Sequence, residues 1–271
     1  MADRYAVIGN PVAHSKSPWI HAQFARQTRQ DIEYARVEAP LEGFARSVAE
    51  FRAAGGRGVN VTVPFKQEAY ALCRGAVSAR ARAAGAVNTL IFDAGSADGE
   101  MRGDNTDGVG LLRDITLNLG RAIAGSRVLL LGAGGAARGV LPPLVDSGPA
   151  ALTIANRTAR RAEELADLFH KVQGGSYREL SGRAFDLVIN ATSSGLENQA
   201  PPLPAGIFAP EALAYDMVYG RDTPFMAVAR AAGAEACDGT GMLVEQAAES
   251  FLLWRGMRPE TAPVLAALRL G

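Results

Sequence analysis

The sequence has few cysteines and no long hydrophobic run, and these absences exclude several classes of protein. Only Cys73 and Cys237 occur, with no CxxC or Cys–His spacing. Neither a disulfide framework nor a zinc site is indicated, no metal ligand is expected, and a reducing compartment fits. No apolar run is long enough to span a membrane, and the N-terminal MADRYAVIG lacks the apolar segment of a signal peptide. We therefore expect a cytoplasmic protein without a membrane partner.

The sequence also lacks an excess of charge of either sign. Lys and Arg together number 28, as do Asp and Glu. Without a net electrostatic field, neither nucleic acid nor an acidic membrane surface is an expected partner. A chain of 271 residues with 48% hydrophobic content is long enough for two cores. Two domains of ordinary size are therefore expected.

Short apolar runs alternate with segments that have an apolar helical face. The first half predicts strands at 5–9, 32–37, 58–63 and 88–92, helices at 17–29, 42–54 and 77–84, and a hairpin turn at 93–99. The second half predicts strands at 128–131, 152–155, 186–190 and 213–216 and helices at 109–119, 242–255 and 259–269. This alternation is typical of an α/β fold with parallel strands.

A glycine-rich turn is the first candidate site. The apolar run of Val128–Leu131 leads into Gly132, Gly134 and Gly135 and then into a helix-forming segment. Glycines there permit a sharp turn and let the backbone approach a pyrophosphate, which then faces the helix N-terminus. A glycine turn without a ligand would have the same pattern. Pro142-Pro143 lies within the following helix and predicts a kink or an early end.

Asn156-Arg157-Thr158, with Arg161 one turn on, follows the second strand of this half. An NAD-binding fold usually has a carboxylate here, which would repel a 2′-phosphate, whereas an arginine can stack on adenine and bind phosphate. The pattern favours NADP. The alternative is that Thr158 only caps the next helix and both arginines are solvated.

The strand at 58–63 alternates, with Asn60 and Thr62 on one face, and is followed by Lys66. Polar side chains near the carboxyl end of such a strand suit a polar ligand. The alternative is a solvent-facing strand and an ordinary surface lysine.

Several other polar residues also have a structural interpretation. Asp107 is placed as the N-cap or the first-turn acid of the helix that it opens, and Ser17 as the cap before Pro18. His14 and His21 have no metal-binding spacing and are expected in a loop and on a helix surface. Gln246 lies in a helix too apolar for an unpaired amide, so either a ligand or a buried hydrogen bond is expected there.

Nine short segments occur in a characteristic order along nearly the whole chain. They are HSKSPWIH (14–21), NVTVPFK (60–66), AGAVNTL (84–90), GDNTDG (103–108), GAGGAAR (132–138), NRT (156–158), INATSSG (189–195), YDMVY (215–219) and DGTGMLVEQA (238–247). Together they resemble the shikimate dehydrogenase family, and only the double proline is unusual. The resemblance implies an NADP-dependent enzyme that interconverts 3-dehydroshikimate and shikimate in aromatic amino-acid (chorismate) biosynthesis.

The resemblance also implies roles by motif position. Lys66 and Asp107 would be the catalytic pair, and Ser15 and Ser17 would hold the substrate carboxylate. The residues that would hold the substrate hydroxyl groups are Asn60, Thr62, Asn88, Asp107 and Gln246. Tyr219 would close on the substrate. The cofactor-binding residues would be Gly132, Ala133, Gly134, Gly135, Ala136, Asn156, Arg157, Thr158, Arg161, Thr192, Met217 and Gly239, the last near the nicotinamide together with Met217.

The implied fold has two α/β domains with the active-site cleft between them. A Rossmann-like NADP-binding domain at 107–239 would be inserted in a substrate-binding domain formed by 1–106 and 240–271. Two other functions are considered, a quinate/shikimate dehydrogenase that uses NAD and a non-catalytic NADP-binding sensor. Lys66, Asp107 and the serine pair favour an enzyme. A monomer or a homodimer is expected.

Overall fold

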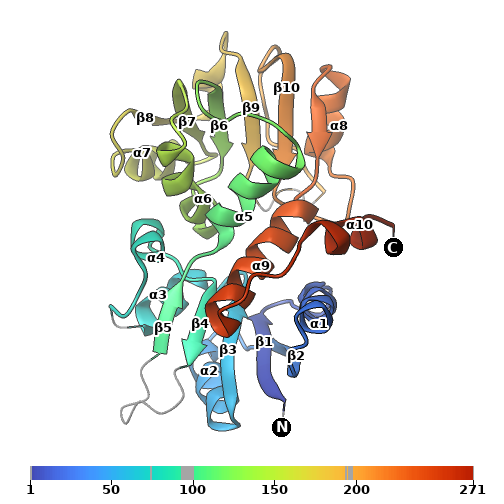
Figure 1. Cartoon of the computed structure of the whole chain (residues 1–271). Helices are drawn as coiled ribbons and strands as arrows, with labels where there is room; N and C mark the ends of the chain where they lie inside the picture. Colours follow the sequence, from blue (N-terminus) through green and yellow to red (C-terminus); the bar gives the residue numbers. More distant parts are fainter. Residues whose placement is uncertain (1, 74, 93–100, 193, 195–197, 271) are drawn as a thin grey trace. The chain divides into compact units, whose positions relative to one another are not determined.

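The computed structural model describes residues 2–73, 75–92, 101–192, 194 and 198–270, and the chain forms two compact units (Figure 1). Unit 1 contains Met1–Gly110 and Leu243–Gly271, and unit 2 contains Leu111–Met242. The chain passes from one unit to the other within two helices, α5 (Asp107–Arg113) and α9 (Thr240–Arg255). The boundaries expected at 106/107 and 239/240 lie a few residues before these crossings.

Unit 1 is built on a mixed sheet with strand order β2-β1-β3-β4-β5. β1 pairs in parallel with β2 and β3, and β4 pairs antiparallel with β3 and β5. The strands are β1 (Asp3–Gly9), β2 (Ile32–Glu38), β3 (Gly56–Val61), β4 (Thr89–Phe92) and β5 (Met101–Asp104). The helices are α1 (Ser17–Thr28), α2 (Phe44–Ala53), α3 (Lys66–Leu72), α4 (Ala79–Ala84) and α10 (Ala262–Leu270).

The two faces of the unit 1 sheet have different coverings. Val59 and Val61 of β3 pack with apolar residues of α2 and α3, as the strand alternation predicts. The opposite face carries Tyr34 and Asn60, and the aromatic contacts of Tyr34 are with α1 and α9. The polar residues of β3 therefore lie on the α1/α9 face.

Unit 2 is built on a parallel sheet with strand order β11-β10-β9-β6-β7-β8 (Figure 1). Its strands are β6 (Arg127–Leu131), β7 (Ala151–Ala155), β8 (Val172–Gly175), β9 (Phe185–Asn190), β10 (Phe208–Asp216) and β11 (Glu235–Cys237). Its helices are the π-helix η1 (Asp114–Asn118), α6 (Gly135–Asp146), α7 (Ala159–Ala166), the 3-10 helix η2 (Tyr177–Leu180) and α8 (Pro224–Ala231). α6 and α7 pack on one face of the sheet and α8 on the other.

Most predicted elements are present, with shifts at their ends. β3 ends at Val61, so Thr62 follows the strand, and Val63 is 50% exposed. The single helix expected at 109–119 is instead α5 followed by η1, and Leu111 and Ile115 are its fully buried apolar residues. The turn expected at 93–99 lies outside the described residues. β5 pairs antiparallel with β4 as the second strand of the expected hairpin. The sequence analysis missed α3, β8, η2, α8 and β11, which are short or weakly periodic.

The double proline does not end α6 early, contrary to one of the two expected outcomes. Pro142 and Pro143 lie inside the helix, which continues to Asp146. The two rings remove two helical N–H donors, but Val140, Leu141 and Leu144 are completely buried in the main core of unit 2. Burial of this apolar face stabilises the helix despite the missing hydrogen bonds.

His21 is not on a helix surface, and that prediction was wrong. Its side chain is completely buried between α1, β2 and α9, surrounded by aromatic rings. His14, in contrast, is exposed in the turn before α1, as predicted. Among the residues that the structure describes, no helix is both long and apolar enough to cross a membrane.

Candidate active site

Lys66 and Asp107 form an ion pair in unit 1. Each is the first residue of a short helix, Lys66 of α3 and Asp107 of α5. The Lys66 Nζ donates a hydrogen bond to Asp107 Oδ2 at 2.6 Å, and the two side chains are only 15% and 6% exposed. The tertiary fold therefore joins two residues 41 positions apart in the chain. Lys66 is not an ordinary surface lysine.

Asn88 fixes the other side of the Asp107 carboxylate. Its Nδ2 donates to Asp107 Oδ1 and to Thr106 Oγ1, each at 2.9 Å. Its Oδ1 accepts from the Thr106 backbone N–H at 2.8 Å. The Asp107 backbone N–H donates to the Asn105 side chain at 3.1 Å. The carboxylate is thus oriented by the neutral amide of Asn88 as well as by Lys66, which suits a group that must hold one position.

Gln246 of α9 joins this polar cluster. Its Oε1 lies 3.4 Å from both Asn88 Nδ2 and Thr106 Oγ1, and its Nε2 donates to the Leu243 carbonyl at 2.9 Å. The amide is partly buried. Intramolecular hydrogen bonds therefore satisfy it, as one of the two sequence interpretations allowed, and it also lies beside the catalytic candidates.

Asn60 of β3 is 6% exposed and held by contacts on both sides. Its Oδ1 accepts from the Tyr34 hydroxyl at 2.7 Å. Its Nδ2 donates to Ser250 Oγ at 2.9 Å, and Thr89 Oγ1 is 3.2 Å away. Thr62 lies just beyond β3, half-buried, and its backbone N–H donates to the Ile8 carbonyl at 2.9 Å.

Ser15 and Ser17 are buried beside the start of α1. Their hydroxyl oxygens are 3.2 Å apart, and the Ser17 backbone N–H donates to Ser15 Oγ at 3.3 Å. The N-cap position belongs to Lys16, whose side chain makes no capping hydrogen bond, so the interpretation of Ser17 as the cap was wrong. Two adjacent hydroxyls at a helix N-terminus provide donors for an anionic group.

The glycine turn in unit 2 joins β6 to α6. Gly132 has φ +106°, and a Cβ there would lie 3.2 Å from the Ala191 carbonyl oxygen. A Cβ at Gly134 would meet nothing within 4 Å. Ala133, Gly135 and Ala136 are half-buried around the N-terminus of α6. The turn therefore needs glycine at one position for backbone conformation and leaves open space at the other, as a pyrophosphate would require.

The segment after β7 presents two arginines to solvent. Arg157 and Arg161 are exposed, and among the described residues neither pairs with a carboxylate. Thr158 occupies the N-cap position of α7 without a side-chain capping hydrogen bond, and its carbonyl accepts from Asn156 Nδ2 at 3.0 Å. Thr158 thus stands at the cap position and both arginines are exposed, as the alternative also expected, and the arginines are available to a phosphate.

The remaining cofactor candidates follow β9, β10 and β11. Thr192 Oγ1 donates to Asn190 Oδ1 at 2.7 Å. Met217 and Tyr219 are half-buried after the end of β10. The Gly239 N–H donates to the Val218 carbonyl, and a Cβ at Gly239 would lie 2.5 Å from the Met217 carbonyl oxygen. Gly239 is thus required for the close approach of two chain segments.

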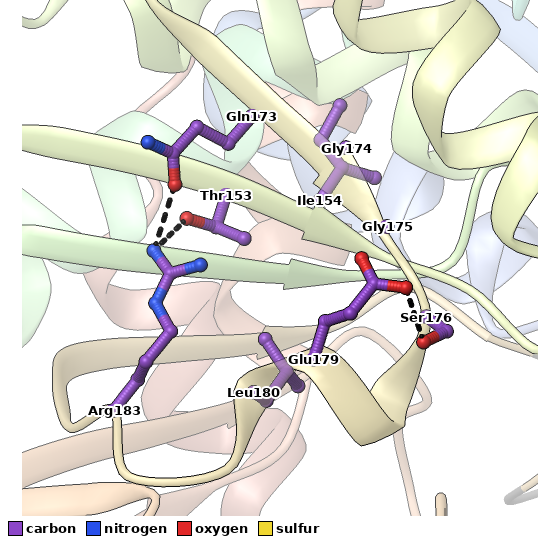
Figure 2. A pocket seen from close by; sticks show the side chains of 9 residues that line it. All are labelled: Thr153, Ile154, Gln173, Gly174, Gly175, Ser176, Glu179, Leu180 and Arg183. Carbon is purple, nitrogen blue, oxygen red and sulfur yellow. Dashed lines mark hydrogen bonds between the residues drawn. The ribbon is translucent and has the colours of Figure 1, made fainter.

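A separate cavity of about 340 Å³ lies in unit 2 between β7, β8 and η2 (Figure 2). Its polar side chains bond with one another: Arg183 donates to Thr153 at 2.7 Å and to Gln173 at 3.0 Å, and Ser176 donates to Glu179 at 2.8 Å. None of the cofactor candidates lines it. We assign it no role. Within the described ranges, no three His, Cys, Asp or Glu side chains gather as metal ligands.

The sequence analysis missed Tyr34, Thr89, Thr106 and Ser250, which hold Asn60 and Asn88. Thr89 follows Asn88 and Thr106 precedes Asp107 within two of the matched segments. Their closeness to the site could therefore have been predicted. No sequence signal marks Tyr34 or Ser250, because only the tertiary fold brings β2 and α9 to Asn60.

A parallel sheet with a glycine turn, together with a buried lysine–carboxylate pair, is typical of α/β oxidoreductases of the dinucleotide-dependent class. Three family models match the chain: the shikimate dehydrogenase substrate binding domain at residues 7–90, shikimate / quinate 5-dehydrogenase at 115–197, and the shikimate 5′-dehydrogenase C-terminal domain at 239–269. The chain belongs to the shikimate dehydrogenase family.

Individual relatives agree with this assignment. A shikimate dehydrogenase (NADP(+)) of Methylobacillus flagellatus is 60% identical over 98% of this chain and 99% of the relative. The crystal structure of an Ael1 enzyme from Pseudomonas putida is 47% identical, covers 98% of both chains and has a TM-score of 0.90. Shikimate 5-dehydrogenase from Thermus thermophilus, in complex with NADP(H) and shikimate, is 37% identical over 99% of both chains, with a TM-score of 0.87.

Proposed function

We propose that this protein is an NADP-dependent shikimate dehydrogenase that interconverts 3-dehydroshikimate and shikimate. The observation that carries the proposal is the Lys66–Asp107 pair inside a polar cluster that also contains Asn88 and Gln246. The names of the relatives support the same substrate and cofactor. The reaction adds a hydride and a proton to a ketone, or removes both from an alcohol.

Lys66 supplies the proton. NADPH, when bound, provides the hydride that reduces the substrate carbonyl carbon. The carbonyl oxygen gains negative charge during this step, and a proton from the Lys66 ammonium converts it to the alcohol. In the reverse direction Lys66 accepts the hydroxyl proton. Asp107 holds the Lys66 Nζ in place, and Asn88 orients the Asp107 carboxylate.

The other substrate candidates provide hydrogen-bonding groups around this pair. Ser15 and Ser17 would bind the substrate carboxylate with their hydroxyls. Asn60, Thr62, Asn88, Asp107 and Gln246 would bind the ring hydroxyls, which both donate and accept hydrogen bonds. Tyr219, which follows β10, would close on the substrate.

The glycine turn fits a dinucleotide pyrophosphate, because Gly134 leaves open space at the N-terminus of α6. The cofactor would be held by Gly132–Ala136 at its pyrophosphate and by Asn156, Arg157, Thr158 and Arg161 at its 2′-phosphate. Thr192, Met217 and Gly239 would line the remainder of the binding region. The exposed arginines favour NADP over NAD.

A spectrophotometric assay tests the proposal directly. The purified chain is mixed with shikimate or quinate and with NADP or NAD, and formation of the reduced nicotinamide is followed. Shikimate with NADP is expected to react fastest. Equal activity with NAD would favour the quinate/shikimate dehydrogenase alternative, and no activity in any combination would favour a cofactor-binding sensor.

Arg157→Ala tests how the cofactor is recognised. Loss of the guanidinium removes a charge-assisted contact to the 2′-phosphate, so the KM for NADP is expected to rise at least tenfold while the KM for NAD changes little. Arg160→Ala is the matched control, because Arg160 is also exposed on α7 but pairs with Glu164. Equal losses for both cofactors would show that Arg157 does not recognise the 2′-phosphate.

We further propose that the protein acts in the cytoplasm as a monomer or a homodimer. The cysteines support a reducing compartment: Cys73 and Cys237 are not joined in a disulfide, and burial raises the pKa of Cys73 to about 11. Size-exclusion chromatography with light scattering would give the oligomeric state.

A further inference from the structure

His21 is a buried polar side chain without a hydrogen bond. It is 0% exposed, and neither Nδ1 nor Nε2 has a partner among the described residues. Burying a polar group without a partner costs about 1–3 kcal/mol. A leucine of similar volume would avoid that cost. The reason for an imidazole ring at this position must therefore lie in the contacts that its flat faces make.

The ring of His21 stacks on the ring of Tyr34. Their centroids are 4.2 Å apart and the planes differ by only 7°. Phe24, Phe251 and Trp254 surround the imidazole at centroid distances of 5.9, 6.2 and 5.5 Å. Of these neighbours only Tyr34 is titratable. His21 therefore makes the closest ring contact between this aromatic core and Tyr34, and Trp254 makes a longer one.

Tyr34 depends on this contact because of its place in the sheet. It lies on β2, an edge strand whose residues are mostly exposed or half-buried. Trp254 lies farther from Tyr34, at 6.3 Å between centroids. His21 is thus the nearest ring that keeps the phenol over the sheet.

The Tyr34 hydroxyl then holds Asn60. It donates to Asn60 Oδ1 at 2.7 Å, while the Asn60 Nδ2 donates to Ser250 on the opposite side. The Nδ2 also lies 3.2 Å from Thr89 Oγ1 and 3.3 Å from the Asn88 carbonyl oxygen, so the Tyr34 hydroxyl holds the oxygen side of the amide. A displaced phenol would release one side of the amide and allow it to turn away from the polar cluster.

We propose that His21 is a positioning residue of the substrate site: its ring holds Tyr34, and Tyr34 orients the Asn60 amide toward the substrate. This inference rests on the proposed function of Asn60 as a ligand of a substrate hydroxyl. His21 touches neither substrate nor cofactor in this scheme. Its contribution is the flat face that another aromatic ring could partly replace.

Three substitutions test the chain of contacts. Tyr34→Phe removes only the hydroxyl, and His21→Leu removes the flat ring. Each is expected to raise the KM for shikimate about tenfold, the loss of one hydrogen bond, with kcat and the KM for NADP within threefold of the unmodified protein. His21→Phe restores the stack and should return the KM to within threefold. The double variant His21→Leu/Tyr34→Phe should lose no more than Tyr34→Phe alone.

Phe24→Leu is the matched control, since Phe24 is equally buried in α1 and packs on the same core without contacting Tyr34. It should lower the melting temperature and leave the KM for shikimate unchanged. An equal rise in KM for Phe24→Leu and His21→Leu would show a general packing role and overturn the proposal. An unchanged KM for Tyr34→Phe would also overturn it, even where the His21 variants do not fold.

Calorimetric binding of shikimate to each variant separates this inference from the proposed function. Unmodified protein that binds shikimate but does not oxidise it would refute the proposed function, while the affinity ratios between variants would still test His21. Unmodified protein that oxidises shikimate, with equal affinity in all variants, would refute the role of His21 alone.

Discussion

Lys66 is the residue on which the chemistry depends. Lys66→Ala removes the proton donor, so kcat is expected to fall by about 10²–10⁴-fold, while the shikimate affinity stays within a few fold. Lys66→Arg keeps a cation beside Asp107 but is a poor acid, and should lose a comparable amount of kcat. Steady-state kinetics and calorimetry check both variants.

Lys171→Ala is the control for loss of a lysine, because Lys171 is exposed in unit 2. Its kinetics should match those of the unmodified protein. A Lys66→Ala variant that retained near-normal kcat would disprove the acid–base role.

At the same scale, His21 gives the protein a pH-dependent stability. Burial lowers the pKa of His21 from 6.5 to about 3. The unfolded chain therefore binds more protons than the folded chain between about pH 3 and 6.5. The contribution of the neutral ring to stability is fully present above pH 6.5 and is lost as the pH falls.

His21→Phe isolates this effect. From pH 6 to pH 5 the free energy of unfolding of the unmodified protein should fall by about 1 kcal/mol more than that of His21→Phe. Urea unfolding at the two pH values measures the difference. Parallel pH dependence of the two proteins would show that His21 titrates normally.

At the scale of an element, two glycines of the turn from β6 to α6 are expected to be needed for different reasons, one for its backbone conformation and the other for the space that it leaves to a ligand. Gly134→Ala adds a methyl group in open space, where φ is an ordinary −84°. Stability should therefore hold or rise by up to about 1 kcal/mol, whereas the KM for NADP should rise at least tenfold because the methyl group occupies the space for the pyrophosphate.

Gly132→Ala is the matched comparison in the same turn. Its φ of +106° disfavours any other residue, so stability should fall by about 1–3 kcal/mol. Thermal unfolding should distinguish the two variants, because only Gly132→Ala is expected to lose stability. Normal NADP kinetics in Gly134→Ala would remove the turn from the cofactor site.

α6 shows a conflict between local preference and packing. Pro143 removes a helical hydrogen bond, yet the helix continues to Asp146. Pro143→Ala should restore an N–H donor and raise the free energy of unfolding by about 2 kcal/mol, the helix-propensity gain less the greater entropy of the unfolded chain. Denaturant unfolding checks this value, and a decrease in stability would show that the ring contributes more by packing.

At the scale of the whole molecule, each unit has its own sheet and its own apolar cores. The substrate candidates other than Tyr219 lie in unit 1, and the cofactor candidates lie in unit 2. Hydrogen exchange should therefore show NADP protecting Gly132–Ala136 and shikimate protecting the segment around Asn88 and Asp107. Protection of the glycine turn by shikimate in the absence of NADP would contradict the assignment of the turn to the cofactor.

The sequence by itself determined the α/β class, most elements and the main candidate residues. Strand and helix patterns are local, because a buried face repeats with the period of its element, so Val59 and Val61 of β3 could be placed from their spacing. The nine motif segments were enough for the family. The double proline in α6 shows where local rules fail, since the buried face of that helix outweighs the missing donors.

Only the tertiary structure decided which polar groups meet. The contacts from Lys66 to Asp107 and from Asn60 to Ser250 span 41 and 190 residues. The burial of His21 was equally invisible, because its surroundings come from β2 and α9 rather than from its own helix. Such contacts depend on how strands are ordered and how helices cover them, and no local pattern encodes that order.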